Sequence, residues 1–322
     1  MKVPTILAVA TVPDGCRHDP LAGPSSVADL CWLTDPGMAP EGLYGTVWES
    51  PAPLGQARLL NLAAALAAER DADALLLLEP GIVVGPAGVE RLVAVATASQ
   101  DLAMACAWTA GEHAVGLPVD EGADLSGDLL SLVDEALWRQ YPDVALDIPA
   151  ALPGAVLITR QGLEVARRAD PALVGAAALV GWSLQMREAG LRVAMTPGVL
   201  AGTASVPARG EDALWPGLTY EDGLVLTRHR PLFADMVEAF RGSGLLDTAR
   251  EHAVAVVVQA LAAAYGWRFG PASWSSSRGP VVATLEPGSD DVELAGAGFR
   301  QRLGIGRADP VATLTRRLGP QR

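Results

Sequence analysis

The sequence is poor in basic residues. Lys and Arg together number 24 against 37 Asp and Glu, which gives the 322-residue chain a net charge of −13, and Lys2 is the only lysine. Proteins that bind nucleic acid neutralise phosphates with clustered Lys and Arg. The composition therefore argues against nucleic acid as a partner.

Cysteine and the usual hydrolase motifs are also scarce. Cys16, Cys31 and Cys106 form an odd, widely separated trio without a Cys-x-x-Cys pair, so neither a disulfide framework nor a zinc site is expected. The four histidines show no His-Glu-x-x-His spacing, and no serine lies in a Gly-x-Ser-x-Gly sequence. These absences argue against a zinc hydrolase and a serine hydrolase.

Long apolar runs are missing as well. The longest run late in the chain, Ala253–Trp267, is interrupted by Gln259 and falls short of the ~20 residues that a membrane-spanning helix needs. The opening MKVPTILAVATVP has one basic residue and no small-residue cleavage site, which predicts a first strand and no signal peptide. We therefore expect a cytoplasmic protein without membrane association.

Half of the residues are hydrophobic, which suffices for a large core. The central stretch is Asp71–Val84, where an apolar run at Ala74–Leu78 passes through Glu79-Pro80-Gly81 into a second apolar run. An apolar strand without alternation is typical of a parallel sheet covered on both faces. Because ligands of such sheets gather at the carboxyl ends of the strands, the turn after Leu78 is the expected site.

Strands are expected to alternate with helices, which indicates an α/β domain with a mainly parallel sheet flanked by helices. The expected strands are 5–10, 27–33, 44–48, 74–78, 82–84, 102–108, 154–159 and 192–195, the last ended by Pro197. The expected helices are 55–70, 88–98, 129–139, 162–168, 182–189, 224–241 and 248–265. This pattern predicts an α/β domain over residues 1–230 and a helical C-terminal extension over residues 231–322.

Three segments carry a family resemblance. In LGQARLLNLAAALAAERDADALLLLEPGIVV, a glycine precedes a helix with Ala, Arg and Asn and then an apolar strand; the matching residues are Gly55, Ala57, Arg58 and Asn61. In PGAVLITRQGLEVARRADPAL, a strand precedes an aspartate-containing turn; the matching residues are Gly154, Arg160 and Asp170. In GWSLQMREAGLRVAMTPG, a helix leads through Ala-Gly into a strand and a proline; the matching residues are Arg187, Ala189, Gly190 and Pro197. The order and spacing resemble family 2 glycosyltransferases of the GT-A fold over roughly residues 5–200.

This resemblance implies that a nucleotide-diphospho-sugar donor lies over the first half of the sheet and that its sugar passes to an acceptor that the sequence does not identify. The donor-site residues predicted from the resemblance and from local chemistry are Thr11, Pro13, Asp35, Arg58, Glu79, Gly81, Arg228 and Arg230. The predicted acceptor residues are Gly154 and Trp182, and the candidate catalytic carboxylates are Glu79 and Asp170.

The reactive residues of the family are degenerate in this chain. The Asp-x-Asp pair, which holds a divalent Mg²⁺ or Mn²⁺ in the family, falls on Glu79-Pro80-Gly81, and one carboxylate is a poor site for either ion. The family's general-base aspartate falls on Ala178-Leu179, where neither side chain can take a proton. No metal site is therefore predicted.

Two interpretations follow. In the first, the protein is an active transferase in which Arg228-His229-Arg230 binds the diphosphate without a metal and Glu79 or Asp170 acts as the base. In the second, it is a glycosyltransferase-like pseudoenzyme that serves as a binding or scaffold partner, with a homo-oligomer or a partner transferase left open. A nicotinamide-binding protein is set aside, because Gly296–Gly298 lacks the third glycine and follows no long strand.

Each candidate also has a structural alternative. The basic triplet at Arg228–Arg230 is read as a solvated turn of a helix, and Trp182 as a core residue at helical spacing. Glu79 and Asp170 are read as turn or capping residues. The helix at Ala253–Ala264 is apolar nearly all round, so it is expected to cap the sheet, with a homodimer face or a membrane as the other readings.

Overall fold

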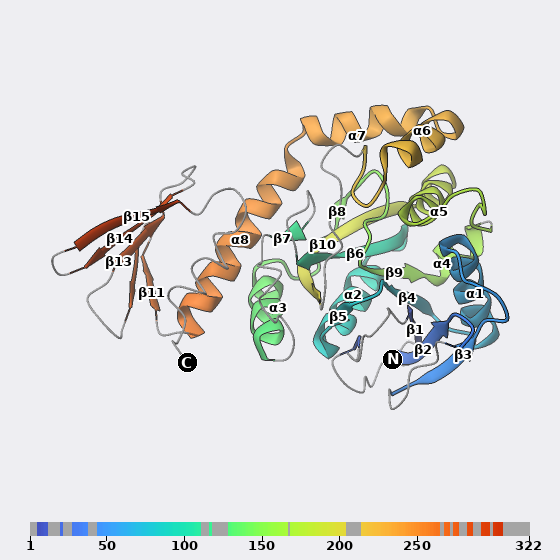
Figure 1. Ribbon diagram of the computed structural model, residues 1–322, viewed down its shortest axis with the longest axis horizontal. Helices are drawn as coiled ribbons and strands as arrows, with labels where there is room; N and C mark the ends of the chain where they lie inside the picture. The colour runs from blue at the N-terminus through green and yellow to red at the C-terminus, as the bar shows by residue number, and fades with distance from the viewer. Residues whose placement is uncertain are drawn as a thin grey trace.

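The computed structural model describes residues 5–11, 20–21, 28–37, 44–110, 116–117, 128–166, 168–203 and 214–264, and the strands at 267–270, 273–276, 282–285, 291–296 and 299–304. Ten strands form one mixed sheet in the order β3-β2-β1-β4-β9-β6-β10-β5, with β7 beside β6 and β8 beside β10 (Figure 1). The strands are β1 (Ile6–Thr11), β2 (Ala28–Thr34), β3 (Thr46–Glu49), β4 (Ala74–Leu78), β5 (Ile82–Val84), β6 (Leu102–Ala110), β7 (Gly116–Leu117), β8 (Leu146–Asp147), β9 (Ala155–Thr159) and β10 (Arg192–Thr203).

The described sheet is mixed, with five parallel and four antiparallel strand pairs, so parallel pairing is less prevalent than predicted. β3, β2, β1 and β4 run parallel, and β6 and β10 run parallel to each other. β9 is inserted antiparallel between β4 and β6. The α/β class is confirmed, and the carboxyl ends of β1, β2, β4, β6 and β10 all lie at one edge of the sheet.

Helices bury both faces of this sheet. They are α1 (Gln56–Glu69), α2 (Pro86–Ala98), α3 (Asp128–Gln140), α4 (Arg160–Val165), α5 (Ala176–Glu188), α6 (Tyr220–His229), α7 (Leu232–Gly242) and α8 (Leu245–Ala264). Within β4, Leu75 and Leu77 join the core cluster that includes α1 and α5, whereas Leu76 and Leu78 join the cluster that includes α2. The prediction that this strand is covered on both faces is therefore confirmed.

The prediction that the strand from Arg192 ends before Pro197 is wrong. β10 continues to Thr203, and its pairing with β6 shifts register between Thr196 and Leu200. Proline has no N–H to donate, so within sheets it is confined to edges and bulges. The irregularity at Thr196–Leu200 is such a place.

One predicted helix is divided in two. The expected helix at 224–241 is present as α6 and α7, which are separated at Arg230-Pro231. The residue before a proline is sterically excluded from the helical region, and Arg230 accordingly has φ −136° and ψ 73°. The proline thus turns the chain between two helices.

The predicted helical C-terminal extension needs a correction. It is helical through α8 and then forms a five-stranded antiparallel sheet, in the order β11-β12-β13-β14-β15. The strands are β11 (Trp267–Gly270), β12 (Ser273–Ser276), β13 (Val282–Leu285), β14 (Asp291–Gly296) and β15 (Phe299–Gly304). Strands of four to six residues give too short a pattern to stand out from a Gly- and Ser-rich tail. Figure 1 shows this sheet beside α8, on the side of the helix away from the ten-stranded sheet.

Within the part of the chain that the structure describes, no helix is long and apolar enough to cross a membrane.

Candidate functional site

A small hollow lies where β1 and β4 end, at the edge of the sheet that the sequence predicts. It is lined by Thr11 at the end of β1, Gln56 at the start of α1, Glu79 after β4, Gly154 before β9 and Leu179 in α5, with their neighbours. Its volume of about 20 Å³ holds about one water molecule, so a larger ligand would lie above it. Three of the predicted residues, Thr11, Glu79 and Gly154, meet here. Pro13 lies outside the described residues.

The turn after β4 has a defined backbone. Ile82 N donates to Glu79 O at 3.1 Å, and Gly81 has φ 77°. Proline at the second position and a positive φ at the third are the signature of a type II turn, which favours glycine there. Glu79 N also donates to Gly154 O at 2.9 Å. The glycine that stands in place of the family's second aspartate therefore has a backbone role.

The donor set does not fit a divalent metal. Mg²⁺ and Mn²⁺ prefer several oxygen ligands, and Glu79 is the one carboxylate among the residues that line the hollow. Across the described part of the chain, no group of three or more His, Cys, Asp or Glu side chains could hold a metal ion.

The start of α1 supplies positive potential instead. Gly55 caps the helix without a side-chain hydrogen bond, and the first turn contains no acidic residue. The N–H groups of an uncapped first turn and the helix dipole together favour an anion. Sequence reasoning placed Arg58 at the donor, but this residue is exposed on α1 and does not line the hollow. The signal that was missed is Gln56, which follows the motif glycine.

Gly154 permits a close approach between β9 and β6. It has φ 124°, and a Cβ at this position would lie 2.3 Å from Cγ2 of Thr109. A side chain at this position would require the Thr109 side chain or the backbone to move. The predicted role of Gly154 at the acceptor remains a prediction, whereas its steric role is evident.

Asp35 and Asp170 are engaged in local structure. Asp35 Oδ1 accepts from Leu54 N at 2.6 Å and so holds the segment before α1 against the end of β2. Asp170 Oδ1 accepts from Ala172 N at 2.9 Å in an exposed turn. Neither residue lines the hollow. The contact of Asp170 fits its turn-forming alternative, and the donor role of Asp35 remains a prediction.

The predicted arginine site is not assembled in this structure. Arg230 forms an ion pair with Glu188 at the end of α5, and β10 begins shortly afterwards at Arg192. Because β10 runs parallel to β4, its beginning lies at the edge opposite Glu79. Arg228 is exposed on α6 and does not line the hollow either. The sequence alone could not show to which edge of the sheet α6 returns.

Trp182 is a core residue. Its exposed fraction is 2%, and Met186 on the same helix is fully buried, which leaves no surface on which a sugar could stack. The prediction of an acceptor platform at Trp182 is therefore wrong, and its structural alternative is confirmed. The family's base position is buried too, since Ala178 and Leu179 are 0% and 3% exposed.

Asn61, a motif residue, joins α1 to the segment after α4. Its Oδ1 accepts from Ala169 N at 2.8 Å, and its Nδ2 donates to Ala169 O at 3.3 Å. Replacing Asn61 by alanine is expected to lower the free energy of unfolding by about 1–3 kcal/mol, because both bonds are lost. Asn61→Asp keeps one bond and should lose less, whereas Arg58→Ala should change little; urea denaturation of the three variants measures the order. Equal losses for all three would contradict this role.

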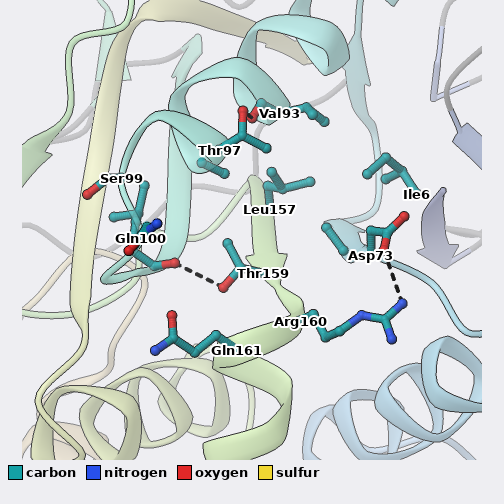
Figure 2. Close-up of a pocket in the computed structure, with 13 residues that line it drawn as sticks. Ile6, Asp73, Val93, Thr97, Ser99, Gln100, Leu157, Thr159, Arg160 and Gln161 are labelled. Carbon is teal, nitrogen blue, oxygen red and sulfur yellow. Dashed lines mark hydrogen bonds and ion pairs between the residues drawn. The ribbon is translucent and has the colours of Figure 1, made fainter. Parts of the chain in front are cut away.

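A larger hollow of about 280 Å³ lies at the opposite edge of the sheet, between the starts of β1 and β4, the end of β9 and the end of α2. Figure 2 shows Arg160 turned toward Asp73, and this arginine also pairs with Asp71. Thr159 Oγ1 donates to Leu102 O at 2.9 Å. These lining groups are bonded to the protein itself, so the hollow offers few free polar groups for a nucleotide.

The described cysteines do not supply a nucleophile. Cys31 and Cys106 are buried, and burial raises the pKa of the Cys106 thiol to about 12. Only the thiolate is nucleophilic. Both side chains are neutral at physiological pH and belong to the core.

Fold and site together define an α/β protein whose candidate ligand site lies at the carboxyl ends of its parallel strands. A search with models of protein families gives no match, and no curated protein matches the chain. Among solved structures, the chain is similar to the mannosyltransferase PcManGT from Pyrobaculum calidifontis in complex with GDP-Man and Mn²⁺, at 15% identity and a TM-score of 0.45, over 84% of this chain and 77% of the other.

It is also similar to GalNAc-T7 with UDP, GalNAc and Mn²⁺, at 14% identity and a TM-score of 0.49, over 91% of this chain and 65% of the other. A third similar structure is glucosyl-3-phosphoglycerate synthase from Mycobacterium tuberculosis with Mg²⁺ and UDP, at 14% identity and a TM-score of 0.40, over 65% of this chain and 73% of the other.

Proposed function

We propose that the chain is a glycosyltransferase-like protein that binds the diphosphate of a nucleotide-sugar donor at the carboxyl ends of β1 and β4. The observation that carries this proposal is the meeting of Thr11, Glu79 and Gly154 with the start of α1 in one hollow. Two of the three segments that resemble family 2 glycosyltransferases supply Gln56, Glu79 and Gly154. The acceptor would approach from the side of Gly154.

The proposed donor site works without a pair of carboxylates and a metal. The first turn of α1 offers N–H groups and the positive end of the helix dipole to the diphosphate. Such preorganised donors also stabilise the negative charge that develops on a diphosphate leaving group. Glu79, the one carboxylate in the hollow, is the proposed base for the acceptor hydroxyl.

Replacing Gln56 by glutamate is expected to weaken the binding of nucleoside diphosphates by about tenfold, because the new carboxylate repels the diphosphate. The fold should become no less stable, since an acidic residue in the first turn stabilises a helix. The measurement is the rise in melting temperature with UDP, GDP or ADP, each with Mn²⁺, Mg²⁺ or EDTA. We expect one nucleotide to raise the melting temperature by the same amount in EDTA as in Mn²⁺ or Mg²⁺.

The matched control is Gln161→Glu, which makes the same charge change in the hollow at the opposite edge. This variant should bind as the unaltered protein does. The donor-site proposal is overturned if no nucleotide raises the melting temperature, or if the two variants lose affinity equally. Loss of binding in EDTA would refute its metal-free character.

The second candidate is a pseudoenzyme that binds the nucleotide but transfers no sugar. The residue types at Ala178 and Leu179 favour it, because the position that corresponds to the family's base holds no titratable group. The two candidates differ in turnover. Release of nucleoside diphosphate from the bound nucleotide sugar, reduced at least tenfold in Glu79→Gln, supports transfer; binding without release supports the pseudoenzyme.

A further inference from the structure

A buried tryptophan that lies beyond the three family-like segments packs against α7. Trp215 is 2% exposed, and the centroid of its ring lies 6.5 Å from that of Phe233 and 5.9 Å from that of Phe240. Both phenylalanines belong to α7, and Arg241 Nη2 near the end of the same helix donates to Leu214 O at 2.9 Å. Edge-to-face and tilted aromatic pairs stabilise beyond the area that they bury. The position of this indole is therefore set by α7.

The four residues from Trp215 to Leu218 form a type II turn with a proline at the second position. Leu218 N donates to Trp215 O at 3.1 Å, and Gly217 has φ 82°. A Cβ at Gly217 would lie 2.9 Å from Cγ of Pro153, so the turn packs closely on this proline. Pro153 directly precedes Gly154, which lines the hollow at the end of β4. The turn thus lies against the segment that supplies one wall of the proposed site.

That segment, residues 148–154, is buried throughout and is held by hydrogen bonds. Trp215 Nε1 donates to Ala151 O at 2.9 Å, and Ala151 N donates to Ser183 Oγ of α5 at 2.9 Å. Three residues further on, Gly154 O accepts from Glu79 N at 2.9 Å. A buried carbonyl that loses its donor is costly, so the segment is expected to move if the indole N–H is removed. One short buried segment therefore connects α7 to the turn that carries the proposed base.

We propose that Trp215 is a positioning residue of the site at Glu79 and acts through the buried segment between Ala151 and Gly154. This inference rests on the proposed function, in which Glu79 is the base for the acceptor hydroxyl. Trp215 itself does not line the hollow; its part is to fix Gly154 O and thereby the backbone of Glu79. A base must lie within hydrogen-bond reach of the proton that it takes, and a displacement of about 1 Å can lower a rate about a hundredfold.

The test is hydrogen exchange of the backbone amides of the chain, followed by NMR, in the unaltered protein and in Trp215→Phe. Phenylalanine keeps an aromatic ring beside α7 and loses the N–H that donates to Ala151 O. We expect the Glu79 amide to exchange about tenfold faster. Trp32→Phe is the matched control, because Trp32 is 3% exposed and its Nε1 donates to Tyr44 O at 2.7 Å. It loses the same kind of bond in β2, which β1 separates from β4, and should change this exchange less than about twofold.

A second variant, Ser183→Ala, removes the acceptor of Ala151 N and should accelerate the Glu79 amide as well. An unchanged Glu79 amide in both Trp215→Phe and Ser183→Ala overturns the proposal. So does an equal acceleration in Trp215→Phe and Trp32→Phe, or one shared by all amides of the sheet, since either is a general loss of stability. Exchange is measured without nucleotide, so it decides this inference even if the donor site fails.

A second readout separates positioning of the base from binding of the donor. If nucleoside diphosphate is released from a bound nucleotide sugar, Trp215→Phe should lower the rate of release about tenfold. The affinity for the nucleotide should stay within about twofold of the unaltered protein. Weaker binding with an unchanged rate of release would contradict the role of Trp215 at Glu79 and leave the donor-site proposal intact.

Discussion

Alanine at position 134 is expected to lower the free energy of unfolding by about 3–5 kcal/mol, because it removes one partner of a buried ion pair. Asp134 of α3 pairs with Arg91 of α2, and the two side chains are 3% and 10% exposed. Its other oxygen accepts from Leu200 N at 2.9 Å in β10. The carboxylate therefore joins two helices to the irregular part of the longest strand, and its loss leaves a buried cation and a buried N–H without this acceptor.

Arg139→Ala is the comparison variant for this measurement. Arg139 is 76% exposed and pairs with Glu135 along α3, and exposed pairs of this kind contribute about 0.3–0.5 kcal/mol. Chemical denaturation in urea measures both variants. If Asp134→Ala lost no more than Arg139→Ala, the remaining contact of Arg91 with Glu135 would suffice to compensate the buried charge.

Replacing Gly154 by alanine is expected to lower the free energy of unfolding by about 2–6 kcal/mol. One part, about 1–3 kcal/mol, is backbone strain at φ 124°; the other, also about 1–3 kcal/mol, is overpacking against Thr109. Since Gly154 O holds the N–H of Glu79, the same change should displace the turn after β4. The two measurements are the melting temperature and the affinity for the nucleotide, and both should fall.

A double-mutant cycle separates the two parts. Thr109→Ser removes the methyl group that a Cβ at position 154 would meet, so in this background Gly154→Ala should retain only the backbone cost. Gly55→Ala is the control for the loss of a glycine, because φ there is −73° and no atom lies within 4 Å of the added Cβ. Additive losses at 109 and 154 would contradict the steric explanation.

The sequence located the candidate site because its signals are local. The apolar run at Ala74–Leu78 predicts a strand covered on both faces, and Glu79-Pro80-Gly81 predicts a turn from residue types alone. The edge at which ligands gather then follows from the sense of the strands. For this reason, the sequence alone predicts that Thr11, Glu79 and Gly154 lie at the same edge of the sheet.

The predictions that the structure contradicts concern features that depend on long-range packing. The helical spacing of Trp182 is the same for a core tryptophan and for an exposed one that stacks on a sugar. Only burial distinguishes the two roles. The direction in which α6 crosses α5 places Arg230 beside Glu188 and away from the donor site. The strands of the C-terminal sheet are short, and their pairing over residues 267–304 has no local signature beyond alternation.

The antiparallel insertion of β9 has a consequence for the order in which the chain can fold during synthesis. β4 ends at Leu78 and β6 begins at Leu102, yet the strand that lies between them starts at Ala155. Until that later segment leaves the ribosome, the nascent chain holds two apolar strands with open hydrogen-bonding edges, and such edges invite pairing with other chains. The half-sheet β3-β2-β1-β4 can form early from nearby residues, but its closure waits for a partner from far along the chain, which slows folding. For this protein, the interval between the synthesis of β6 and that of β9 is the period in which a chaperone would have the most to protect.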